Sequence, residues 1–196
     1  TGNFTQTAGG ALLLDIDHLT ATADRIDAAG LASLEGAIEL NQINISAIKP
    51  GTSATVLVSA AGGLEAGDLE LSTVPSIVTQ YALDAISDTE LALTLTTTFV
   101  PQGPDGERLL PNERRVGAYI NQVQLAGSST ALAPTIAGLV ASTEVASLGS
   151  KYQLLSPENY GALPLAAVQS GLLFGESLLS CKVRDGEARF TDEGEC

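Results

Sequence analysis

The chain has 196 residues, of which 44% are hydrophobic and only 4% aromatic, and its formal net charge at pH 7 is −14. Such an excess of acids repels the phosphates of nucleic acids and anionic lipid headgroups, and it argues against both as partners. The apolar content suffices for one large or two small domains with a core of Leu, Ala, Val and Ile. Because an intact translation product begins with Met and this chain contains none, we expect a processed or excised piece.

The first hundred residues have the pattern of short strands separated by glycines. The clearest strand is residues 90–98, where Leu91, Leu93 and Leu95 alternate with Ala and Thr. Many short strands with Gly turns are typical of a sandwich, a barrel or a β-solenoid with rungs of roughly twenty residues, and periodicity leaves all three open. The expected strands cover residues 3–6, 11–17, 24–28, 31–34, 37–41, 53–60, 69–72, 77–82 and 90–99.

The pattern changes to helices after a Pro- and Gly-rich stretch, residues 101–111, which we interpret as a linker without regular structure. Asn112 is a good N-cap for the helix that follows it. Ser156 and Pro157 form the clearest helix start, with a capping hydroxyl and Pro at the first position. The apolar residues 161–180 are interrupted by Pro164 and Glu176, which favours an amphipathic helix over a membrane span.

No residue pattern indicates a catalytic site, a metal site or a cofactor. His18 is the single histidine, and with no Gly-x-Ser-x-Gly motif in the chain we expect an exposed turn histidine, not a catalytic base. Asp15, Asp17, Asp24 and Asp27 either collect around calcium or form a solvated acidic face, and the absence of a calcium-binding repeat favours the solvated face.

Specific phrases carry a resemblance to a known family. Gly-Asn-Phe-Thr-Gln at residues 2–6 is followed by an apolar strand at 10–17, an Ala-Asp strand at 23–27 and Gly-Leu-Ala-Ser-Leu-Glu-Gly at 30–36. Residues 111–120 (PNERRVGAYI) and 154–163 (LLSPENYGAL) continue the series. Together they resemble the C-terminal part of an autotransporter passenger and the helical region ahead of its outer-membrane β-barrel.

The resemblance implies a right-handed parallel β-helix followed by a small α-helical segment. Residues 1–100 would be the β-helix stem, 101–111 the linker and 112–196 the helical connector. The implied function is a non-enzymatic structural module that supports secretion and display at the cell surface or outer membrane of a Gram-negative bacterium, or in a secreted form. Its partners would be its own upstream passenger, stacked on the open strand edge, and the downstream barrel. The expected core of the rungs consists of Leu12, Leu14, Ile26, Leu34, Ile38, Val56, Val58, Leu93 and Leu95.

An extracellular location also bears on the two cysteines. An even count in an oxidising compartment favours a disulfide between Cys181 and Cys196, closing a loop at the end of the connector. Two other functions stay open. The chain could be the self-assembling subunit of a homo-oligomer, an extracellular filament or a layer, since contacts that do not close produce fibres. It could also be an adhesin module, although its low aromatic content argues against carbohydrate binding.

Overall fold

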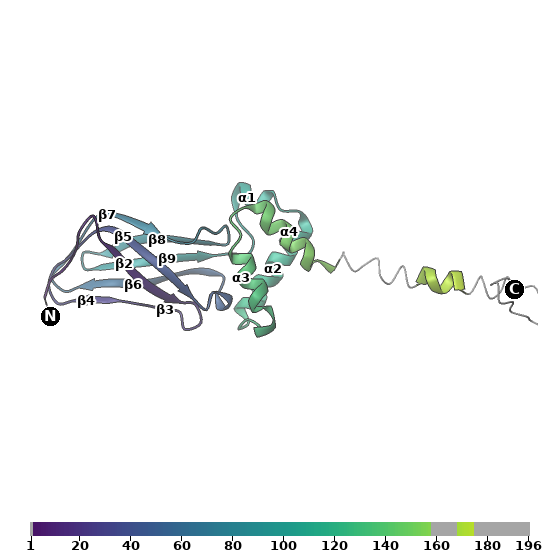
Figure 1. The fold of residues 1–196 in the computed structure, drawn as a ribbon, viewed down its shortest axis with the longest axis horizontal. Helices are drawn as coiled ribbons and strands as arrows, with labels where there is room; N and C mark the ends of the chain where they lie inside the picture. Colours follow the sequence, from purple (N-terminus) through teal and green to yellow (C-terminus); the bar gives the residue numbers. More distant parts are fainter. Residues whose placement is uncertain (1, 158–167, 175–196) are drawn as a thin grey trace, which may run out of the picture. The chain divides into compact units, whose positions relative to one another are not determined.

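The structure is a computed structural model that describes residues 2–157 and 168–174. Two compact units make up the chain, Thr1–Gln153 and Leu154–Cys196. The first unit contains the described strands together with helices α1 to α3 and most of α4 (Figure 1). It therefore includes both the predicted β half and a large part of the predicted helical connector. In the second unit, residues 168–174 form a helix, as the interpretation of residues 161–180 predicts for this part.

One sheet is organised around the long central strand β5. Strands β1, β2 and β7 all lie parallel to β5. Because β7 pairs with the same β5 residues as β1 and the start of β2, the latter two strands follow one another along the opposite side of β5. Strand β3 closes antiparallel onto the end of β2. The strands are β1 (Phe4–Gln6), β2 (Ala11–Asp17), β3 (Thr22–Ala23), β5 (Ala32–Ile43) and β7 (Leu64–Ser72).

The other sheet has the strand order β4-β6-β9-β8. Strand β4 is parallel to β6, whereas β9 is antiparallel to both of its neighbours, β6 and β8. From β4 to β8 the chain alternates between the two sheets, and β9 then stays beside β8. The strands are β4 (Ile26–Ala28), β6 (Gly51–Ala60), β8 (Thr79–Ser87) and β9 (Glu90–Thr97).

The predicted right-handed parallel β-helix is wrong. The fold is mixed α/β, with two small mixed sheets that do not form solenoid rungs. The physical reason lies between β8 and β9, where a two-residue connection, Asp88 and Thr89, joins the strands. So short a connection permits antiparallel pairing alone. Ser87 stabilises it, because its Oγ accepts a hydrogen bond from the Thr89 amide at 3.2 Å.

Apolar side chains from both sheets meet in one core. Leu14, Leu34 and Ile38 come from the first sheet and Val58 and Leu93 from the second, and all five are buried. The sheets therefore pack face to face. Two further members of the expected core, Leu12 and Ile26, are partly buried against this cluster. Leu95 belongs to a second cluster, which also contains buried residues of the helices.

Val56 is not a fully buried core residue, although its spacing of two residues from Val58 predicted that both would be. It is half-buried, and Leu57 is fully buried beside Val58. The register of β6 against β9 shifts between Val56 and Val58, which marks a β-bulge. A bulge inserts one residue and reverses the alternation of faces beyond it, so that two consecutive side chains reach the core. Simple period-two alternation could not anticipate this.

Gly36 allows a close approach of β5 to the turn between β1 and β2. Its φ of +84° lies in the left-handed region, and the register of β5 against β7 shifts beside it. A Cβ atom here would lie 2.5 Å from the carbonyl oxygen of Gly10 and 2.9 Å from those of Thr7 and Ala8. Both the conformation and the available space therefore require glycine.

We expect Gly36→Ala to lower the free energy of unfolding by about 1–3 kcal/mol, because it combines a strained conformation with a backbone clash. Gly9→Ala is the matched control in the same region, since a Cβ at Gly9 meets nothing within 4 Å. Urea unfolding followed by circular dichroism measures both variants. Equal stability of the two would contradict the role assigned to Gly36.

Five helical segments follow β9 in the described chain up to Leu155. The 3-10 turn η1 (Ile45–Ala47) lies earlier, between β5 and β6. The segment expected to be an irregular linker contains helix α1, since Pro104 fits the first turn of a helix. The helical segments are α1 (Gly103–Glu107), α2 (Pro111–Leu125), η2 (Thr130–Leu132), α3 (Ala133–Val140) and α4 (Val145–Leu155).

Candidate functional site

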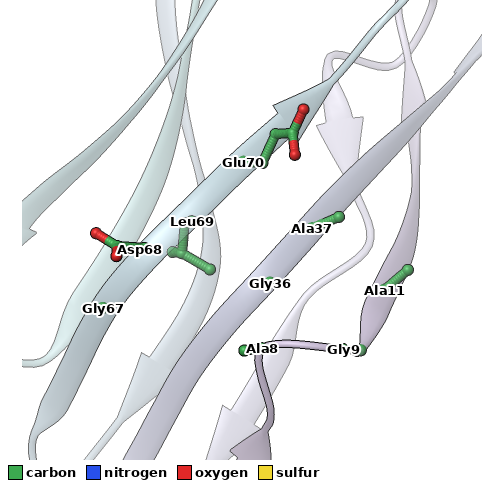
Figure 2. A pocket seen from close by; sticks show the side chains of 10 residues that line it. Ala8, Gly9, Ala11, Gly36, Ala37, Gly67, Asp68, Leu69 and Glu70 are labelled. Carbon is green, nitrogen blue, oxygen red and sulfur yellow. The ribbon is translucent and has the colours of Figure 1, made fainter.

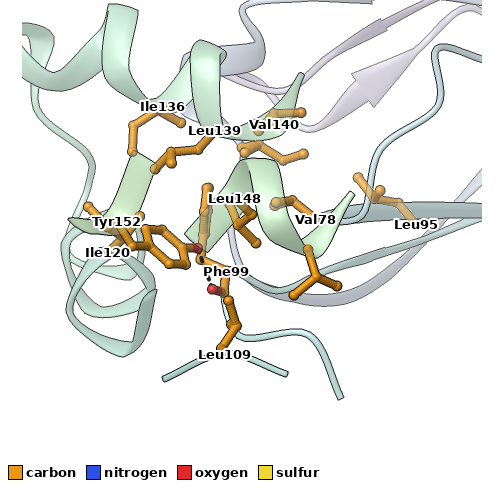
Figure 3. Packing of buried hydrophobic residues seen from close by; sticks show 12 residues of the cluster. Val78, Leu95, Phe99, Leu109, Ile120, Ile136, Leu139, Val140, Leu148 and Tyr152 are labelled. Atoms are coloured by element: carbon orange, nitrogen blue, oxygen red, sulfur yellow. Dashed lines mark hydrogen bonds between the residues drawn. The ribbon is translucent and has the colours of Figure 1, made fainter. Parts of the chain in front are cut away.

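The helices join the strands of the first unit through a second apolar cluster, which we call the helical junction (Figure 3). Figure 3 shows Phe99 and Tyr152 beside each other, with Leu139 and Leu148 above them. One continuous core therefore spans the end of the sheets and the helices. Its buried members are Ile48, Val78, Leu95, Phe99, Leu109, Ile120, Ile136, Leu139, Val140, Val145, Leu148 and Tyr152.

Polar side chains of the helices bind backbone groups of the β half at this junction. Gln124 of α2 donates from Nε2 to the carbonyl oxygens of Ser46 at 2.9 Å and Ile48 at 2.8 Å. Asn121 accepts a hydrogen bond from the Phe99 amide at 3.0 Å. These bonds satisfy backbone groups that no longer belong to a strand ladder, and buried groups of that kind need partners.

Tyr152 of α4 contributes the most buried polar contact of this set. Its side chain is fully buried and its hydroxyl donates to the carbonyl oxygen of Phe99. Burial raises the pKa of the Tyr152 hydroxyl well above its usual value. The phenol therefore remains a neutral hydrogen-bond donor throughout the physiological pH range.

Tyr152→Phe should lower the free energy of unfolding by about 1–3 kcal/mol, because it removes the donor and leaves a buried carbonyl without it. The control is Tyr119→Phe in α2, whose side chain is 63% exposed, and it should leave stability within about 0.5 kcal/mol of the parent. Chemical denaturation of the parent and of both variants measures their free energies of unfolding. A parent-like Tyr152→Phe would exclude an energetic role for this bond.

His18 is not the exposed turn residue that the sequence led us to expect. It is only 6% exposed, and its amide donates to the Ile43 carbonyl oxygen at 3.1 Å. Its Nε2 atom has no hydrogen-bond partner among the described residues. Burial lowers the pKa of His18, outweighing a hydrogen bond to Gln42 and the charge of Asp17, which both raise it. The imidazole is therefore a buried neutral group.

This burial predicts a pH dependence of stability. Above the ordinary pKa of 6.5 the folded and unfolded chains both hold a neutral His18. Below it, the unfolded chain binds a proton that the folded chain resists, so the free energy of unfolding decreases as the pH falls. Urea unfolding at about pH 7.5 and 5.5 should show a smaller decrease for His18→Gln than for the parent. An identical decrease in both proteins would refute this origin.

The acidic residues considered for calcium are each engaged by protein groups. Asp15 accepts from Asn41 at 2.8 Å, and Asp17 accepts from Asn44 at 2.9 Å. The Asn44 contact is the main reason that the pKa of Asp17 is lowered. Asp24 accepts the Asp15 amide, and Asp27 forms an ion pair with Arg25 at 2.7 Å. Within the described residues, no group of three or more metal-ligating side chains comes together.

A shallow trough of small residues crosses the first sheet at the turn between β1 and β2 (Figure 2). Its volume is about 730 Å³, and it extends from Gly9 and Ala11 across Gly36 and Ala37 of β5 to Asp68 and Glu70 of β7. Figure 2 shows no aromatic side chain in it. Apart from the two exposed carboxylates of Asp68 and Glu70, the residues that line the trough are Gly, Ala and Leu.

The predicted helix starts lie close to the observed boundaries but differ in detail. Helix α2 begins at Pro111, so that Asn112 is its second residue and Leu110 occupies the N-cap position. The Leu110 side chain cannot cap the helix, and the Glu113 side chain does so instead: its Oε2 accepts a hydrogen bond from the Leu110 amide at 2.8 Å. Ser156 and Pro157 directly follow α4, and the rest of the helix predicted to start there would fall on residues 158–167. That stretch, like Cys181 and Cys196, lies outside the described residues.

No family model, no curated protein and no solved structure matches this chain. Among the helices that the structure describes, none combines the length and the apolar character that crossing a membrane requires.

Proposed function

We propose that this chain is a non-enzymatic structural module of the Gram-negative cell surface, which connects an autotransporter passenger to its outer-membrane barrel. The observation that carries the proposal is the helical junction, where strands and helices share one apolar core. Such a junction transmits position from the β half to the helices without a flexible hinge, which is what a connector requires. The ordered series of family-like phrases at residues 2–36 and 111–163 supports the same role.

The charge of the chain also suits this role. A net charge of −14 keeps a surface protein soluble at high local density. In the described structure the acids that could have formed a metal site instead bind neighbouring protein groups. Their roles are structural, in keeping with a module that supports display.

Surface display of an epitope tag tests the proposal. The tagged chain, placed ahead of an autotransporter barrel in a Gram-negative host, should expose the tag on intact cells. Leu148→Asp should reduce that signal several-fold, because Leu148 is fully buried in the helical junction and an unpaired buried carboxylate costs several kcal/mol. Leu125→Asp is the matched control, since Leu125 of α2 is 62% exposed.

Total protein in whole-cell lysates corrects for expression. Equal display of both variants and the parent would show that a folded junction is unnecessary and would contradict the proposal. No display of the parent, with the barrel inserted normally, would contradict it as well.

A further inference from the structure

The two sheets expose two strand edges of different character. We call the β1, β2 and β4 side the neutral edge and the β7 and β8 side the acidic edge. Among the described residues, β1 and β4 each pair with one strand, β5 and β6 respectively, and β2 meets β3 only at Ile16 and Asp17. On the opposite side, β7 pairs with β5 and β8 with β9. Both edges therefore offer backbone groups to a further strand.

Charge protects one edge and not the other. Strand β7 carries exposed Glu65, Asp68 and Glu70, and β8 carries exposed Asp84. Charged side chains on edge strands oppose pairing with another chain. Residues 2–14, which include β1 and most of β2, contain no charged side chain. The one acid of β4, Asp27, is paired with Arg25.

The free backbone groups of the neutral edge can be assigned from the ladder. Gly10 and His18 bond β5, since the Gly10 carbonyl accepts the Ala37 amide and the His18 amide donates to Ile43. Residues of a parallel strand bond alternate sides, and β2 shows no register shift, so Ala11 and Leu13 direct their backbone groups away from β5. The Leu13 side chain is also 63% exposed.

The open part of β2 ends after Leu13. At the next outward position, the Asp15 carbonyl accepts the Asp24 amide at 2.9 Å, and the Asp15 amide donates to the Asp24 carboxylate at 3.1 Å. Asp24 thus closes the acidic end of the strand, while the uncharged end stays open. The pairing surface is confined to the segment that bears no charge.

We propose that a second copy of this chain pairs with the neutral edge, β2 lying antiparallel to its counterpart about a two-fold axis centred near Leu12, so that Ala11 of one copy faces Leu13 of the other. An isologous contact brings the same surface of both copies together, so a neutral segment meets a neutral segment. This contact is favoured over pairing through the acidic edge. Each copy has a net charge of −14, and pairing through the acidic edge would add local repulsion by bringing Glu65, Asp68 and Glu70 near their own counterparts. The inference goes beyond the proposed connector role, since it joins two modules side by side.

Light scattering after size-exclusion chromatography, over about 1–200 µM chain, tests the pairing. The parent should approach twice its 20.0 kDa mass as concentration rises. Added salt should strengthen the pairing by screening the repulsion between two acidic copies. Leu13→Lys should remain a monomer, with at least a tenfold weaker association, because it places a charge on the neutral edge.

The matched control is Leu19→Lys, which introduces the same charge at a residue of similar exposure, 64%, beyond the end of β2. It should associate as the parent does. Amide hydrogen exchange gives an independent readout, since the Leu13 amide should exchange more slowly in the dimer. A parent that stays monomeric, or a Leu13→Lys chain that pairs as well as Leu19→Lys, would overturn the proposal. So would a protected Leu13 amide in a monomeric longer passenger, since preceding polypeptide would then occupy the edge.

Discussion

Phe99 is the residue on which the connection between strands and helices depends. It follows β9, its side chain is fully buried in the helical junction, and helices bind both of its backbone groups. Asn121 accepts its amide hydrogen and Tyr152 donates to its carbonyl oxygen. Gly117 permits this approach, because any Cβ there would collide with the Phe99 carbonyl. One residue thus couples the packing of α2 and α4 to the end of a strand.

Other polar side chains near this junction serve the same coupling. Gln124 donates to the carbonyl groups of Ser46 in η1 and of Ile48 directly after it, and Ser76 donates to the Val140 carbonyl at the end of α3 at 2.6 Å. Lys151 likewise donates to the Gly138 carbonyl and the Ser142 hydroxyl. Buried donors and acceptors are costly when unpaired, so such contacts fix where each helix lies. A module built in this way is suited to holding neighbouring segments in place, in accordance with the function we propose.

The two strand edges of the β half differ in charge. The acidic side chains of β7 and β8 discourage any further strand, whereas the uncharged start of the chain leaves β1 and β2 available. Self-pairing depends on the neutral edge, whereas the connector role rests on the helical junction. Each proposal therefore depends on a different set of contacts.

The sequence by itself determined local features: strands before Gly103 and helices after it, and the alternation of Leu91, Leu93 and Leu95, since these follow from side-chain periodicity. It could not determine which strands pair or in which direction, because pairing depends on contacts between distant residues, and the hairpin at Asp88 carries no glycine signal. The bulge beside Leu57 and the burial of His18 also arose from tertiary packing. A family resemblance predicted a regular solenoid, but the antiparallel pairing of β9 decided otherwise.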